Sequence, residues 1–307
     1  MVQPIGEAAG PARDSGAGGI GRAGRPSPTV QRRRLGLELR RLRQKARLTI
    51  EEVARSLDCS TAKVSRIETG KLKARQIDVD AMLRLYGVRD PEVREQLLQL
   101  NRGARATGWW RSFEEVLPPG FETFIGLEAD AVAVRTYAPA VVPGLLQTAD
   151  YARALLRAGY RNAPPDDVEQ MVKLRTTRQE RLTETQNPLR LRAVVDEAVL
   201  RRPVGGRDVM KHQLLSMAEL ASRTNVHLQV LPFETGAHSA LSGMFTLLEL
   251  PDEADADVVY VEGPAGSVYL EKPPDVRRAA EIFATLAEQA LDADRSVRVI
   301  LAAAEEM

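Results

Sequence analysis

The sequence predicts an α+β chain, in which an N-terminal all-helical domain of five helices precedes a mixed α/β domain. Helical periodicity and helix-capping residues dominate residues 31–105. Over residues 106–307, β-branched and alternating runs are separated by helical segments. The chain has 307 residues, of which 44% are hydrophobic, so it is long and apolar enough for two such domains.

Charge is divided unevenly between the two ends of the chain. The net formal charge is only +1, but residues 1–75 contain 17 Lys and Arg against 7 Asp and Glu. Residues 76–307 contain 26 Lys and Arg against 35 Asp and Glu. A cationic head on an acidic body is typical of proteins that bind a polyanion such as nucleic acid, although solvated helix faces give the same composition.

The first 30 residues predict a disordered tail. Residues 1–30 contain seven Gly, four Pro and no aromatic residue, so they offer little that could fill a core. A cationic run follows at Arg32, Arg33 and Arg34. The residues alone leave two interpretations open for this run, either contact with DNA phosphates or a solvated entry to the first helix.

Five short helices are expected between residues 35 and 102. In the first of them, Leu35 and Leu39 fall on one face, as apolar residues do on a helix that packs against a core. The second helix is expected to begin at Thr49, because Thr49 and Glu52 have the spacing of a capping box. The last two helices are expected over residues 78–86 and from the N-cap Asp90 to about Gly103.

The third helix has clear start and stop signals. Ser60 is a good N-cap, and Gly70 stands where a left-handed residue ends many helices. Val64 and Ile67 are one turn apart and are expected to face inward together. The opposite face of this helix therefore points outward.

The second and third helices together satisfy the requirements of a helix-turn-helix. The turn between them is short, and Asp58 in this turn tolerates a left-handed conformation. Val53 on the second helix can pack against Val64 on the third. Glu68 lies on the inner side of the third helix, where a carboxylate needs a cation. We therefore predict a structural Arg43–Glu68 pair between the first and third helices.

The outward face of the third helix carries the candidate DNA contacts. Arg66 can donate two hydrogen bonds to O6 and N7 of a guanine, worth roughly 1–3 kcal/mol of discrimination. Thr61 and Ala62 can contact a thymine methyl group or a base edge. Lys63 and Ser65 are expected to contact phosphate, which sets the register on the duplex and makes affinity depend on salt.

The segment LRRLRQKARLTIEEVARSLDCSTAKVSRIETGK resembles the DNA-binding domain of the phage-repressor and xenobiotic-response-element (XRE) family of helix-turn-helix regulators. The resemblance covers about residues 35–90 and implies a lambda-repressor-like fold that binds double-stranded DNA. It places base contacts at Thr61, Ala62 and Arg66, and phosphate contacts at Lys71, Lys73 and Arg75. Since one such domain covers only a short site, we expect a homodimer on half-sites about one helical turn apart.

Beyond residue 105, the sequence predicts a sheet of antiparallel or mixed strands with helices packed on it. The strand-like runs are residues 131–142, 189–195, 226–233, 244–251, 258–263 and 267–271. The helical runs are residues 166–182, 207–221 and 274–291. Trp109 and Trp110 precede all of them and are expected to pack at the domain junction, with a ligand pocket as the alternative.

From about Trp109 to the C-terminus, and especially in its WW and VPGLLQT motifs, the chain resembles a domain of unknown function, DUF5753. In high-GC filamentous bacteria this domain commonly follows such a helix-turn-helix. The resemblance implies a transcriptional regulator of development and secondary metabolism, or an antitoxin-like protein. The latter would bind a small protein encoded by an adjacent gene and autoregulate its operon. A regulator that responds to a small molecule is the third alternative.

The residues favour neither an enzyme nor a metalloprotein. His212, His227 and His238 lie apart, and the single Cys59 is not in ligand spacing with any of them. The sequence contains no nucleophile elbow, P-loop or dinucleotide fingerprint, so no cofactor is expected.

The sequence also favours a cytoplasmic, nucleoid-associated protein. A single cysteine allows no internal disulfide. The chain has no apolar run of about 18 residues, so no membrane partner is expected. Its N-terminal residues lack the apolar core of a signal peptide.

Overall fold

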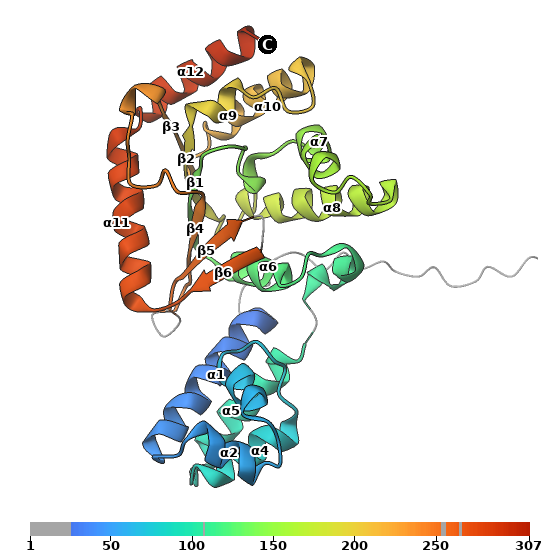
Figure 1. Cartoon of the computed structure of the whole chain (residues 1–307), viewed down its shortest axis with the longest axis vertical. Coiled ribbons are helices and arrows are strands. Elements are labelled where there is room, and N and C mark those ends of the chain that lie inside the picture. Colours follow the sequence, from blue (N-terminus) through green and yellow to red (C-terminus); the bar gives the residue numbers. More distant parts are fainter. Residues whose placement is uncertain (1–25, 107, 253–255, 264–265) are drawn as a thin grey trace, which may run out of the picture.

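The structure is a computed structural model, and it describes residues 26–106, 108–252, 256–263 and 266–307. It consists of a helical unit and a larger unit built on a six-stranded sheet. The two units are joined where the N-terminal end of α1 meets the larger unit (Figure 1). Most of the predicted tail lies outside the described residues.

The helical unit contains the five predicted helices around one core. They are α1 (Pro28–Lys45), α2 (Ile50–Ser56), α3 (Thr61–Glu68), α4 (Gln76–Leu85) and α5 (Pro91–Ala104). The capping box of Thr49 and Glu52 is present, and Asp90 caps α5. Val53, Val64 and Ile67 are buried with the leucines of α1, as the periodicity predicted.

The first helix begins earlier than the sequence indicated, so placing residues 28–30 in a disordered tail was wrong. Ser27 caps α1 by accepting a hydrogen bond from the Val30 amide at 3.3 Å, and Pro28 follows it at the first helical position. Val30 is only 1% exposed and belongs to the core of the larger unit. Its packing partners come from beyond residue 120, so nearby sequence could not reveal this turn.

The larger unit is built on a mixed sheet with the strand order β3-β2-β1-β4-β5-β6. The strands are β1 (Ala133–Ala138), β2 (Arg190–Asp196), β3 (Val226–Leu231), β4 (Phe245–Glu249), β5 (Val258–Gly263) and β6 (Gly266–Leu270). The first three pair in parallel, whereas β4, β5 and β6 continue the sheet antiparallel. Each of the six strands lies within one residue of a predicted run, and the prediction of an α+β chain is confirmed.

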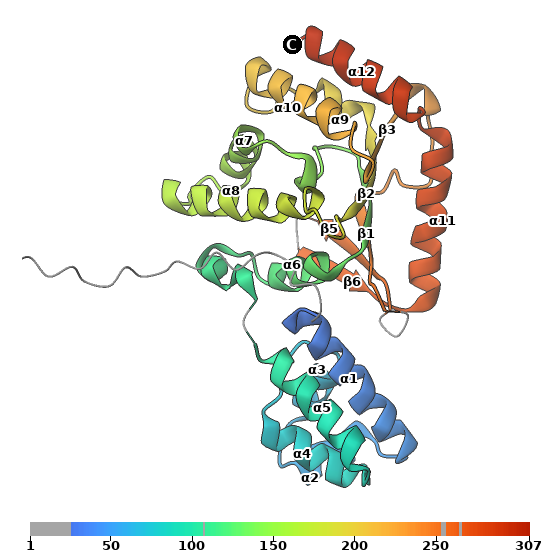
Figure 2. The same cartoon turned by 180° about the vertical axis from the view of Figure 1, so that it is seen from behind.

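Helices cover both faces of this sheet (Figure 1). On one face, α11 (Pro273–Gln289) packs Phe283 and Leu286 against β-strand residues such as Tyr137. The other face carries α6 (Phe121–Asp130), α7 (Ala149–Gly159), α8 (Pro165–Gln179), α9 (Glu197–Arg201), α10 (Arg207–Leu220) and α12 (Ala293–Glu305). The view from behind shows the same arrangement (Figure 2).

The tryptophans lie in a 3-10 helix, Trp109–Val116, at the edge of the larger unit. Trp110 is buried with Phe113, Ile125 and Leu174, so its ring packs in a small core of its own.

Polar contacts fix α1 to the larger unit. The Ser27 amide donates to Asp130 Oδ2 at 2.6 Å, and the Ser27 hydroxyl donates to the Gly126 carbonyl at 2.9 Å. Arg33 lies 3.1 Å from Glu271 and Arg34 lies 3.0 Å from Asp252. The solvated interpretation does not hold for these two arginines, since they pair with carboxylates of the acidic body, whereas contact of the run with DNA phosphates stays a prediction. Those carboxylates are more than 200 residues away in the sequence.

Gly36 lies where α1 crosses the end of α3. A Cβ atom at this position would lie 2.6 Å from the Glu68 carbonyl oxygen and 2.7 Å from that of Ile67. Backbone atoms at such distances cannot rotate away, unlike a flexible side chain. The absence of a side chain at Gly36 therefore sets how closely α1 and α3 approach.

We expect Gly36→Ala to lower the free energy of unfolding by about 1–3 kcal/mol, the usual cost of overpacking a core. In an ordinary helix interior the same change stabilises by up to about 1 kcal/mol, so the sign is diagnostic. The matched control is Gly159→Ala in α7, where a Cβ meets nothing within 4 Å. Urea denaturation of both variants checks the prediction, and a gain in stability for Gly36→Ala would contradict it.

Candidate nucleic-acid interface

The turn between α2 and α3 holds the two helices in a fixed relation. Asp58 takes a positive φ of 48°, as its position in the turn predicted. Ser60 then caps α3 by accepting a hydrogen bond from the Lys63 amide at 3.2 Å. Val64 and Ile67 are buried beneath α3, so the opposite side of this helix faces outward.

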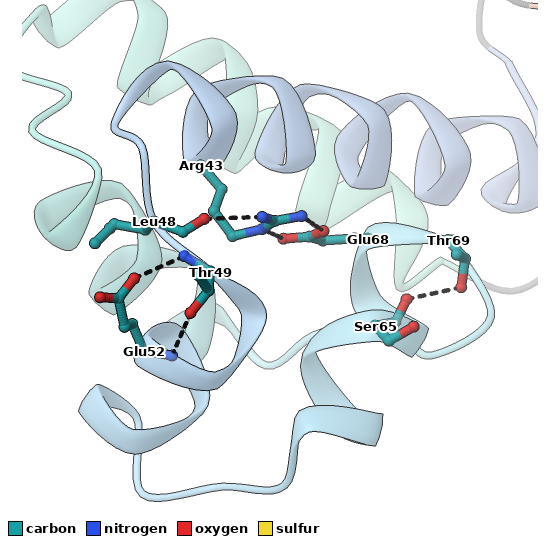
Figure 3. Close-up of polar contacts among 7 residues, drawn as sticks. All are labelled: Arg43, Leu48, Thr49, Glu52, Ser65, Glu68 and Thr69. Atoms are coloured by element: carbon teal, nitrogen blue, oxygen red, sulfur yellow. Dashed lines mark hydrogen bonds and ion pairs between the residues drawn. The ribbon is translucent and has the colours of Figure 1, made fainter.

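The structure brings Arg43 and Glu68 together as a bidentate ion pair (Figure 3). Arg43 Nε and one terminal nitrogen donate to the two Glu68 oxygens at 2.7 and 2.8 Å. The other terminal nitrogen donates to the Leu48 carbonyl at 2.9 Å. Both side chains are buried, and the hydrogen bonds to Glu68 raise the pKa of Arg43. This pair joins α1 to α3 and to the loop that leads into α2.

The three candidate base-contacting residues, Thr61, Ala62 and Arg66, are all exposed on the outer side of α3. Thr61 and Ala62 form the first turn of the helix, which is the end that enters a major groove in helix-turn-helix proteins. Arg66 Nε donates to the Ala62 carbonyl at 3.2 Å, so its guanidinium folds back along its own helix. This hydrogen bond is exposed to solvent.

The segment after α3 presents two exposed lysines. Thr69 closes the helix by donating its hydroxyl proton to the Ser65 carbonyl at 2.8 Å (Figure 3). Ser65 itself is partly buried. Gly70 follows with φ of 66°, and the chain then turns so that Lys71 and Lys73 are exposed. Within the described part of the chain, neither lysine takes part in an ion pair.

The other two predicted phosphate-contacting cations, Lys63 and Arg75, both pair with the carboxylate of Asp78, which was not predicted from the sequence. Lys63 Nζ lies 2.9 Å from Asp78 Oδ2, and Arg75 donates to Asp78 from two nitrogens at 3.0 and 3.1 Å. Asp78 is buried. Its pKa is lowered mainly by the hydrogen bond from Arg75 and, to a smaller extent, by the hydrogen bond from Lys63. The sequence did offer a signal for this pairing, because Asp78 lies in the first turn of α4 and follows several cationic residues within a few positions.

The histidines do not gather into a site. His238 Nε2 lies 3.3 Å from the Tyr137 hydroxyl, and His212 and His227 are exposed on other elements. Cys59 is partly buried against the helical core. In the residues that the structure covers, no group of three or more His, Cys, Asp or Glu is arranged to hold a metal ion. In the same residues, no helix is both long enough and apolar enough to span a membrane.

Comparisons with known proteins agree with this division of the chain. A family model described as a helix-turn-helix domain matches residues 34–97, which run from within α1 to within α5. A second model, described as a domain of unknown function (DUF5753), matches residues 121–302, which is more than half of the chain. No curated protein and no solved structure matches the chain.

Proposed function

Because the chain belongs to the DUF5753 family and carries a helix-turn-helix domain ahead of it, we propose that it is a sequence-specific transcriptional regulator of the XRE type. A helix-turn-helix domain supports a DNA-binding regulator in general, and the outer side of α3 supports the finer assignment. There Thr61, Ala62 and Arg66 stand exposed on a helix whose inner side is fixed by Arg43 and Glu68.

In the proposed complex, α3 lies in the major groove with its N-terminal turn against the base edges. Arg66 exchanges its hydrogen bond with the Ala62 carbonyl for two bonds to a guanine. Lys71 and Lys73 contact phosphate directly. Lys63 and Arg75 also contact phosphate, from the positions in which they pair with Asp78. Ser65 contacts phosphate where α3 approaches the backbone of the duplex.

We further propose that the protein binds as a homodimer, because one α3 helix reads only a few base pairs. Two copies would then contact half-sites about one helical turn apart on one face of the duplex. Such a regulator acts on the chromosome, in the cytoplasm of a bacterial cell. A pseudo-palindromic operator is the expected sign of this arrangement.

The test is selection of operator sequences by the full chain, followed by binding measurements with Arg66→Ala. We expect this variant to bind the selected duplex roughly 5- to 150-fold more weakly and to lose preference at one base pair, because a bidentate contact is worth about 1–3 kcal/mol. Fluorescence anisotropy with single-base operator variants measures both effects.

The matched control is Lys71→Gln, which removes one cation without touching a base. It should weaken binding to all duplexes uniformly and reduce the slope of log affinity against log salt by about one. Unchanged sequence preference in Arg66→Ala would argue against the proposed base contact. Absence of any binding by the unmodified chain at low salt would overturn the proposed function as a whole.

A further inference from the structure

A cavity of about 330 Å³ lies in the larger unit, between the sheet and the helices α6, α7 and α8. Most of its wall is apolar, and the side chains of Phe121, Phe124, Leu155, Met171 and Leu174 are typical of it. The VPGLLQT motif also contributes to the wall. The size is at the lower end of the range for small-molecule pockets.

Two arginines of α8 line this cavity, but only one of them is neutralised. Arg178 donates to both oxygens of Glu128 at 2.6 and 2.8 Å, and its guanidinium lies over the rings of Phe121 and Phe124 at 5.4 and 5.2 Å. Burial works to lower the pKa of Arg178, but the charge and hydrogen bonds of Glu128 outweigh it and raise that pKa. The pair is a satisfied structural element.

Arg175, one turn before Arg178, has no such partner. Among the described residues no carboxylate lies within ion-pairing distance of Arg175, and its one hydrogen bond is from a terminal nitrogen to Gln147 Oε1 at 2.6 Å. Burial lowers the pKa of Arg175 to about 10, the positive charge of Arg178 acts in the same direction, and the negative charge of Glu262 opposes both. Its remaining donors are neither bonded to these residues nor sealed from solvent.

The hydrogen-bond network around Gln147 holds Arg175 in place. Gln147 is 4% exposed, and its amide nitrogen donates to the Val142 carbonyl at 2.6 Å. The Gln147 carbonyl in turn accepts from Gln179 at 2.6 Å. Because the side-chain amide and the backbone carbonyl of Gln147 are both hydrogen-bonded, Gln147 is fixed in place and orients the Arg175 guanidinium before any ligand binds. Such preorganisation reduces the entropy that binding would otherwise cost.

We propose that this cavity binds a small amphiphilic carboxylate, with the carboxylate on Arg175 and the hydrocarbon body against the apolar wall. A partly buried cation without a carboxylate partner is costly where its surroundings are mostly apolar, and an anion that forms charge-assisted hydrogen bonds reduces that cost. A guanidinium presents two parallel donors that match one carboxylate.

A phosphate dianion fits this site less well than a carboxylate. It would need more than one available cation, and Arg178 is already bonded to Glu128. The exposed Glu262 also lines the cavity, and its negative charge would repel a second charge on the ligand. A single negative charge is therefore the best match. This inference concerns binding to the chain alone, so it stands or falls independently of the proposed DNA binding.

The experiment compares octanoate and 4-phenylbutyrate with their uncharged amides, octanamide and 4-phenylbutyramide, using calorimetric titration of the full chain without DNA. We expect the acids to bind roughly tenfold to a hundredfold more tightly than the amides, as charged hydrogen bonds imply. Arg175→Met should remove this difference. Lys173→Gln, a charge change at an exposed position of the same helix, should leave it intact.

Two further readouts separate a binding role from a structural one. Without ligand, Arg175→Met removes one hydrogen bond to Gln147 but breaks no ion pair, so its melting temperature should fall far less than that of a variant that breaks a buried ion pair, such as Glu128→Leu. Leu155→Trp fills the cavity and should abolish binding of all four compounds while Arg175 is retained. Equal affinity of acids and amides, or no binding of any of the four at millimolar concentration, would overturn the proposal.

Discussion

Replacing Glu68 by leucine is expected to lower the free energy of unfolding of the helical unit by about 3–5 kcal/mol. The substitution leaves the Arg43 guanidinium buried with two of its donors unsatisfied. Removing one member of a buried ion pair costs this much because the remaining charge can neither reach water nor find another partner. Such a loss is a large fraction of the stability of a domain of this size.

Hydrogen exchange provides the measurement, because it reports on α1, α2 and α3 separately from the rest of the chain. Both tryptophans lie in the larger unit, so the unfolding transition followed by their fluorescence should change little. The matched control is Glu38→Leu, which breaks the exposed ion pair with Arg41 and should cost less than about 1 kcal/mol.

The double variant Arg43→Met, Glu68→Leu tests the cause of the effect. If the uncompensated charge is responsible, removing both partners should restore most of the lost stability, since apolar replacements of buried ion pairs are often neutral or better. If the double variant is as unstable as Glu68→Leu, loss of shape rather than loss of charge balance explains the result.

The Arg43–Glu68 pair also shows what the sequence could predict. The two residues are 25 positions apart, on helices whose inner faces follow from local periodicity. The capping residues Thr49, Ser60 and Asp90 could be placed for the same reason, because each acts on backbone two or three residues away. Local rules were sufficient wherever partners were local.

Features that depend on distant residues could not be predicted. Val30 packs on elements beyond residue 120, and the partners of Arg33 and Arg34 are in the last third of the chain. Gly36 gave a weak signal, since a glycine inside a helix usually has a packing reason, but its neighbours on α3 could not be identified. The cavity around Arg175 is lined from several helices and strands, so no single segment carries its pattern.

The second large effect is expected from Glu128→Leu, which removes the partner of Arg178. Arg178 and Glu128 are 6% and 3% exposed, so the guanidinium would remain buried without a counter-charge. The free energy of unfolding of the larger unit should fall by about 3–5 kcal/mol. Tryptophan fluorescence follows this unit directly, because Trp110 packs on Ile125 of α6 and Leu174 of α8.

The control for this substitution is Glu169→Leu on α8. It breaks a bidentate ion pair with Arg153 that is exposed, so a loss below about 1 kcal/mol is expected. A similar loss of unfolding free energy in both variants would mean that the buried Arg178–Glu128 pair contributes no more to stability than an exposed ion pair. It would also remove the reason for treating Arg178 as unavailable to a ligand.

The same variant connects stability to the proposed ligand. In Glu128→Leu the cavity contains two arginines without a carboxylate partner, so an anion gains a second cation. Octanoate should therefore raise the melting temperature of Glu128→Leu more than that of the unmodified chain, because at a given concentration a ligand that binds the folded state more tightly stabilises it more. Octanamide should give no such difference. If octanoate stabilises both proteins equally, its carboxylate does not reach Arg178.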